Sequence, residues 1–138
     1  MKFSKSLLTA SAVLIGTVLV GLPLYAQSLA LRVNIPFEFS AGQHTLPAGT
    51  YIVEKRGDVL LISDGKSNIA TILSNGTRNK AYKMESMVVF HRYGDQRFLS
   101  EVRWSDSSTA RALMETPAER RLAKGIPAEP TTLAAINR

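Results

Sequence analysis

Residues 88–104 read Val-Val-Phe-His-Arg-Tyr-Gly-Asp-Gln-Arg-Phe-Leu-Ser-Glu-Val-Arg-Trp. Two runs rich in aromatic and β-branched residues flank the polar stretch Tyr93-Gly94-Asp95-Gln96, a pattern typical of a β-hairpin. The segment contains one of the two histidines of the chain, its single tryptophan and five charged residues. We therefore expect this hairpin to organise a sheet and to carry any polar site.

Two registers of the hairpin are open. A two-residue turn at Gly94-Asp95 pairs His91 with Phe98 and sets Arg92 opposite Arg97, a like-charge pair that costs stability. A three-residue turn that includes Tyr93 sets His91 opposite Arg97 instead, and it satisfies more side chains. The longer turn is therefore the favoured prediction. In either register we expect one core face to be shared by Phe98, Val102 and Trp104.

The segment before the hairpin is predicted to form several short strands. Apolar residues occupy all five odd positions of 31–39, which is the alternation of a half-buried strand, and Pro36 indicates that the strand lies at a sheet edge or bulges at this residue. Residues 51–56 and 59–63 flank the turn Gly57-Asp58, and residues 69–73 follow as a third strand. The continuous apolar run 59–62 predicts burial on both faces.

One helix is predicted near the end of the chain, at about residues 117–124. Thr116 stands at the N-cap, Pro117 at the first helical position and Glu119 at the third, which is a capping box. Gly125 ends the helix, and residues 126–138 are expected to be a flexible tail. The predicted fold is all-β, mainly an antiparallel barrel or sandwich, with one short C-terminal helix in a single domain over 31–125.

The first 26 residues resemble a cleavable signal peptide. Lys2 and Lys5 precede a charge-free apolar run from Leu7 to Leu22, and small residues follow it, with cleavage expected after Ala26 or Ala30. We therefore expect a periplasmic or secreted protein with no membrane span after cleavage. The chain has no cysteine and hence no disulfide. Losing the two lysines leaves 15 basic and 11 acidic residues, a charge of +4.

Catalytic and metal-binding patterns are sparse. His91 could act as the base of a hydrolase, with Glu101 as the nearest carboxylate, but none of the usual serine-nucleophile or metalloprotease motifs occurs in the sequence. A metal site built on His44 and His91 would need a third ligand. We therefore expect no catalytic residue, no metal and no cofactor.

We expect the polar residues to form a recognition surface rather than a catalytic or metal site. The candidates are residues around the hairpin turn and in a basic loop: His91, Arg92, Tyr93, Asp95, Arg97, Arg78, Lys80 and Lys83. The moderate positive charge fits an envelope protein, an envelope polymer or an anionic surface as partner. Nucleic acid is not expected, because no basic run is interleaved with stacking aromatics.

An ordered set of motifs resembles a family of small exported proteins of unknown function that is common in acidobacterial genomes. The motifs are Val33-Asn34-Ile35-Pro36-Phe37-Glu38-Phe39, Leu46-Pro47-Ala48-Gly49-Thr50-Tyr51 and Phe90-His91-Arg92-Tyr93-Gly94-Asp95 with Phe98-Leu99-Ser100-Glu101-Val102. The resemblance runs from about residue 31 to 124. It implies export and a β-rich domain, and it brings no established activity, cofactor or catalytic residue.

Together these features predict an exported, non-enzymatic β-domain that acts as a binding or interaction module of the bacterial envelope. The alternative is a small β-barrel that carries an apolar ligand in its interior. A hydrolase that uses His91 is the third hypothesis.

Overall fold

The computed structural model describes residues 29–136, so the predicted signal peptide lies outside the described residues. The described part of the chain is mostly β, with 57% of its residues in strands and 6% in one short helix. Among the described residues, no helix reaches the length and apolarity needed to cross a membrane. The strands are β1 (Ala30–Ile35), β2 (Phe39–Ala41), β3 (His44–Leu46), β4 (Gly49–Arg56), β5 (Val59–Ser63), β6 (Asn68–Arg78), β7 (Met87–Tyr93), β8 (Gln96–Arg103), β9 (Thr109–Leu113) and β10 (Glu129–Ala134), and the helix is α1 (Pro117–Ala123).

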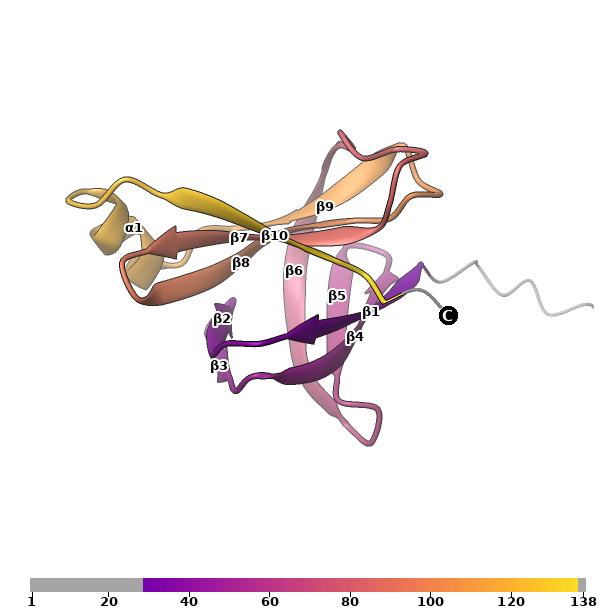
Figure 1. The fold of residues 1–138 in the computed structure, drawn as a ribbon, viewed down its shortest axis with the longest axis horizontal. Helices are drawn as coiled ribbons and strands as arrows, with labels where there is room; N and C mark the ends of the chain where they lie inside the picture. Colours follow the sequence, from indigo (N-terminus) through magenta and orange to yellow (C-terminus); the bar gives the residue numbers. More distant parts are fainter. Residues whose placement is uncertain (1–28, 137–138) are drawn as a thin grey trace, which may run out of the picture.

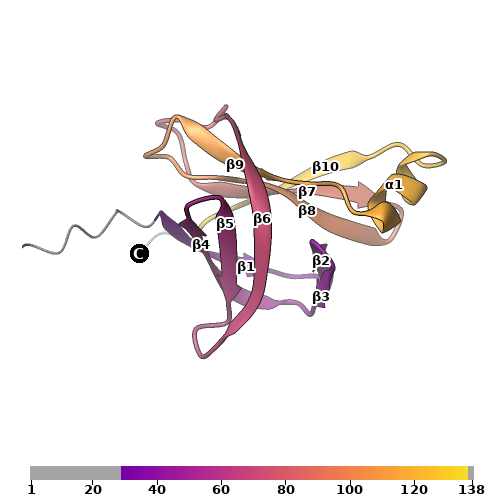
Figure 2. The ribbon, with the colours of Figure 1, turned by 180° about the vertical axis from the view of Figure 1, so that it is seen from behind.

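The ten strands form one connected sheet that is not closed into a barrel (Figure 1). The order β1-β4-β5-β6-β9-β8 is continued on one side by β2-β3, and β7 lies between β8 and β10. The sheet has two halves, one formed by β1, β4 and β5 and the other by β2, β3, β7, β8, β9 and β10. Strand β6 joins them, since its first part pairs with β5 and its last five residues pair with β9. Seen from behind, β6 runs the full height of the molecule between the halves (Figure 2).

The core lies between the two halves and is filled by large side chains. Phe90 packs edge-on against Phe37 and Phe39, with ring centroids 5.0 and 5.5 Å apart, and Phe39 packs in the same way on Tyr51. Aliphatic residues complete the cluster, and the fully buried ones are Ile35, Leu60, Ile62, Val33, Val53, Val88 and Val102.

Two predictions for the first half have different outcomes. Strand β1 is an edge strand, as Pro36 predicts, because it pairs only with β4. The prediction that β5 is buried on both faces is wrong. Val59 and Leu61 are only half-buried, while Leu60 and Ile62 face the core. The apolar run 59–62 is continuous in the sequence, but the core covers only one face of β5, so its other face stays partly exposed.

The hairpin β7–β8 adopts the shorter turn, so the favoured three-residue turn is wrong. His91 pairs with Phe98 and Arg92 with Arg97, and Gly94 supplies the positive φ of 61° that the tight turn requires. The two arginines avoid each other. Arg92 donates from Nε to the Gly94 carbonyl at 2.7 Å, and the Arg97 guanidinium lies 4.5 Å above the Phe37 ring.

A β-bulge in β8 changes which side chains share a face. Val89 pairs with Glu101 and Phe90 with Leu99, so Ser100 is the extra residue. Leu99 therefore joins Val102 on the core face, and Phe98 falls on the opposite face with its partner His91. The predicted core face shared by Phe98 with Val102 and Trp104 is wrong for this reason.

The C-terminal segment is partly as predicted. Helix α1 spans Pro117–Ala123, and its N-cap Thr116 accepts a hydrogen bond from the Glu119 amide at 3.2 Å. The flexible tail expected from residue 126 is wrong, because residues 129–134 form β10 along β7. The Ile136 amide then donates to the Arg32 carbonyl at 2.7 Å, which ties the end of the described segment to β1.

Candidate functional site

The outer face of the β7–β8 hairpin carries a group of hydrogen-bonded polar side chains, and α1 packs against it. Glu119 belongs to the first turn of α1, and its side chain is only 6% exposed. Its Oε2 accepts a hydrogen bond from the Tyr93 hydroxyl at 2.8 Å and lies 3.3 Å from Nδ1 of His91. On the other side of the imidazole, Ser100 Oγ lies 3.2 Å from Nε2. We call Tyr93, His91, Ser100 and Glu119 the outer-face cluster.

The proton positions in the outer-face cluster follow from its chemistry. An ionised carboxylate only accepts, so Glu119 requires donors from both Tyr93 and His91 Nδ1. A neutral imidazole that donates from Nδ1 has Nε2 free as an acceptor, and the Ser100 hydroxyl can donate to it. Burial and the hydrogen bond to the Glu119 carboxylate raise the pKa of Tyr93 to about 12, so the phenol stays protonated.

Sequence reasoning missed two members of the outer-face cluster. Glu119 was assigned to the capping box, but its side chain turns to the hairpin, and only the Thr116 half of the box forms. Ser100 carries no motif and is presented by the bulge. Glu101, the carboxylate expected near His91, instead makes a two-point ion pair with Arg103, at 2.9 and 3.2 Å.

The residues of the predicted recognition surface around the β7–β8 turn, which we call the tip, are only partly exposed. Tyr93 is 3% exposed and belongs to the outer-face cluster, so it is not a surface residue. His91 is half-buried, and Asp95 is exposed at the turn. Arg92 is partly exposed and lies 3.8 Å from the carboxylate of Glu129.

The basic loop lies at the opposite end of the hairpin from the tip. It connects β6 to β7, while the β7–β8 turn and α1 lie together at the other end of the molecule (Figure 1). Buried Asn79 anchors the loop, donating to the carbonyls of Trp104 and Ser107 at 2.8 and 2.6 Å. The structure therefore does not join the basic residues of this loop to the tip. Arg78 is the last residue of β6, and Lys80 and Lys83 lie in the loop that follows.

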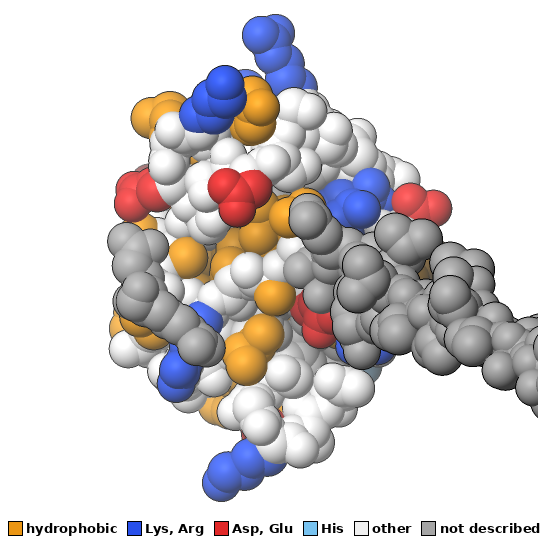
Figure 3. Space-filling view, turned by 90° about the vertical axis from the view of Figure 1, so that its right-hand side faces the viewer, with side chains coloured by type: hydrophobic (Ala, Val, Ile, Leu, Met, Phe, Trp, Pro, Cys, Tyr) orange, Lys and Arg blue, Asp and Glu red, His pale blue; other side chains and the backbone are white. Residues whose placement is uncertain are grey.

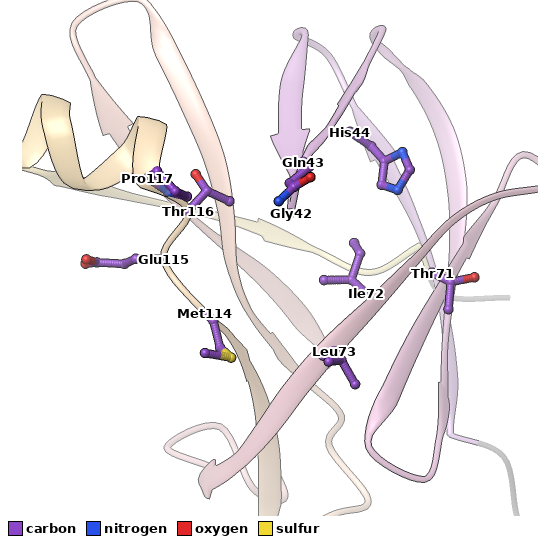
Figure 4. Close-up of a pocket in the computed structure, with 10 residues that line it drawn as sticks. All are labelled: Gly42, Gln43, His44, Thr71, Ile72, Leu73, Met114, Glu115, Thr116 and Pro117. Atoms are coloured by element: carbon purple, nitrogen blue, oxygen red, sulfur yellow. The ribbon is translucent and has the colours of Figure 1, made fainter.

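A groove of about 370 Å³ lies between the β2–β3 turn, the middle of β6 and the segment that leads into α1 (Figure 4). Ile72 points from β6 toward the β2–β3 turn, and Met114 faces it from the other wall. Leu73 and Met114 are 67% and 63% exposed, which is unusual for large apolar side chains. Polar side chains at the rim include Gln43 and Thr116. We call this site the α1 groove.

The outer-face cluster supports one wall of the α1 groove. Thr116 and Pro117 line the groove, and both belong to the N-terminal end of α1. Glu119 fixes this end of the helix to the hairpin through Tyr93 and His91. The position of the groove wall therefore depends on the contacts of one buried carboxylate.

A second hollow of about 380 Å³ lies where β1 begins and the described chain ends, and its lining includes Leu31, Ile52 and Ile136. Figure 3 shows the side of the molecule that lies at the right in Figure 1, where hydrophobic side chains are divided by polar surface, with lysines and arginines at the rims. Residues 29–136 bring no three histidine, aspartate or glutamate side chains together as a metal site. His44 and His91 lie on separate strands, β3 and β7.

Comparisons with known proteins identify no relative. The chain matches no protein-family model, no curated protein and no solved structure. The resemblance to the exported acidobacterial family therefore stays a prediction from its motifs.

Proposed function

We propose that this chain is an exported interaction domain that binds an apolar segment of another protein of the bacterial envelope in the α1 groove. The observation that carries the proposal is the exposure of Leu73 and Met114, which lie in the lining of one hollow with polar groups at its rim. Apolar centres with polar rims are the usual anatomy of protein interfaces. The flexible thioether of Met114 suits a surface that adapts to its partner.

The form of the interior favours an interaction domain over a carrier. Phe37, Phe39, Phe90 and Tyr51 fill the space between the two halves of the sheet with a chain of edge-on contacts. A lipocalin-like carrier would need that space for its ligand. The α1 groove is open to solvent, and its volume of about 370 Å³ suits one or two side chains of a partner.

Photo-crosslinking in the cell that makes the protein tests the proposal. A photoreactive residue at position 114 should give one adduct whose added mass is that of a protein, and Leu73→Asp should abolish it. The matched control places the same residue at position 84, because Met84 is 72% exposed and lies outside the groove lining. Equal adducts from both positions, or none from position 114, would overturn the proposal. A small-molecule adduct at position 114 would favour the carrier instead.

A further inference from the structure

The outer-face cluster contains one contact that the docking of α1 does not require. Tyr93 and His91 Nδ1 already hold the Glu119 carboxylate. Ser100 lies beyond the imidazole, with Oγ 3.2 Å from Nε2, and it touches neither α1 nor Glu119 in the contacts of the cluster. Serine, imidazole and carboxylate thus stand in a line, in the order of a nucleophile, its base and the group that orients the base.

We propose that Ser100 is an activated nucleophile, with His91 as its general base and Glu119 as the positioning residue, and that it attacks small activated acyl esters. The proposal goes beyond the interaction function and uses none of the residues that line the α1 groove. Glu119 accepts from Nδ1–H, which leaves Nε2 as the acceptor for the Ser100 proton. Because the carboxylate is buried and also bound by Tyr93, the ring is held in the tautomer that the reaction needs.

The proposed step balances without any further reactant. Ser100 Oγ bonds to the acyl carbon while its proton passes to His91 Nε2. The ester C–O bond then breaks, and the alcohol leaves with that proton. Water, deprotonated by the same nitrogen, attacks the acyl-serine, and the acid and free Ser100 are released.

Access to the site limits the substrate to small acyl groups. The His91 side chain is 35% exposed and Ser100 is half-buried, so a reagent can approach both from solvent. The bulge puts Ser100 on the outer face, where the neighbouring Phe98 and Val89 are themselves buried. Only the small exposed area around Ser100 and His91 is therefore open to a substrate, which suits a short acyl chain better than a long one.

Labelling of the full chain with a fluorophosphonate probe tests the proposal, because the probe bonds only to activated hydroxyl groups. We expect one adduct per molecule, mapped to Ser100 by peptide mass spectrometry. Ser100→Ala should abolish it, and His91→Ala should slow it by roughly 100-fold or more. The matched control is Ser108→Ala, which removes an exposed serine in the β8–β9 connection and should leave the labelling unchanged.

Two variants separate a positioning role of Glu119 from a structural one. Glu119→Gln should slow the labelling of Ser100 several-fold while circular dichroism confirms the native fold, and Glu119→Asp, which keeps a carboxylate, should retain more of the rate. Absence of an adduct on the folded wild type, an adduct at another serine, or labelling that does not depend on His91 would each overturn the proposal. None of these outcomes affects the crosslink expected at position 114.

Discussion

The two faces of the β7–β8 hairpin are built on different principles. The inner face is apolar and fully buried, with Val88, Phe90, Leu99 and Val102 in the core cluster. The outer face joins aromatic and polar residues, and a helix held by a buried carboxylate covers part of it. Burial alone explains the inner face. The outer face also depends on hydrogen bonds between β7, β8 and α1, so its state is sensitive to protonation.

The bulge at Ser100 is what separates these faces. Leu99 and Val102 both face the core, although they are three residues apart, and strict alternation would put them on opposite faces. Because Ser100 is the extra residue, Phe90 pairs with Leu99 on the core face, and the Ser100 side chain lies beside His91 on the outer face. One inserted residue thus completes the core and also supplies a polar side chain to the outer face.

The largest expected effect comes from the inner face. Phe90→Ala should lower the free energy of unfolding by about 3–5 kcal/mol, because the ring is fully buried against Phe37 and Phe39 in the core. Urea unfolding of the two proteins measures the difference.

Phe98→Ala is the matched change on the outer face. Phe98 is buried to a similar degree and packs on Tyr93, but the short helix on this side can shift into the space that is lost. The expected loss is about 2 kcal/mol. An equal or larger loss for Phe98 would show that the outer face is part of the same rigid core.

Local sequence patterns predict those elements whose conformation is determined by their own residues rather than by a neighbouring strand. The alternation over 31–39 predicts a strand there, and its first part forms β1 at the edge of the sheet, because alternation depends on the backbone of that strand alone. The strand breaks after Ile35, at Pro36, and the chain pairs again only in β2. Strand β10 has no such pattern. Residues 129–134 are Glu-Pro-Thr-Thr-Leu-Ala, and they become a strand because the exposed edge of β7 offers them backbone partners.

The next largest effect is expected at Glu119. Glu119→Ala should cost about 2–3 kcal/mol, since it leaves the buried Tyr93 hydroxyl and one side of His91 without their acceptor. Amide hydrogen exchange should rise in α1 and stay low in β7 and β8. Glu115→Ala removes an exposed carboxylate four residues earlier and should cost about 0.5 kcal/mol or less. Equal losses for both variants would show that Glu119 does not anchor the helix.

The outer-face cluster could not be assembled from the sequence. Glu119 lies 28 residues after His91, and its local context of Thr116 and Pro117 predicts a cap, which accounts for its identity without any contact to the hairpin. Ser100 depends on the bulge, and a bulge arises from the pairing of two strands rather than from one of them. Only His91 and Tyr93 stand out in sequence, because they lie beside the hairpin turn.

The smallest expected effect appears only at alkaline pH. The folded protein raises the pKa of Tyr93 to about 12 from the ordinary value of 10.0, through burial and the Glu119 carboxylate. The folded state therefore holds this proton more tightly, and the stability it contributes is complete below pH ~10 and is lost as the pH rises toward ~12. Tyr93→Phe should flatten the fall in unfolding free energy over that interval by about 2 kcal/mol. Denaturant titrations at stepped pH measure this slope.

The control is Tyr82→Phe, at an exposed tyrosine in the basic loop, which should leave the slope unchanged. If Tyr93→Phe also leaves the slope unchanged, the phenol ionises as readily in the folded chain as in the unfolded one, and the outer face is no more sensitive to protonation than the inner one.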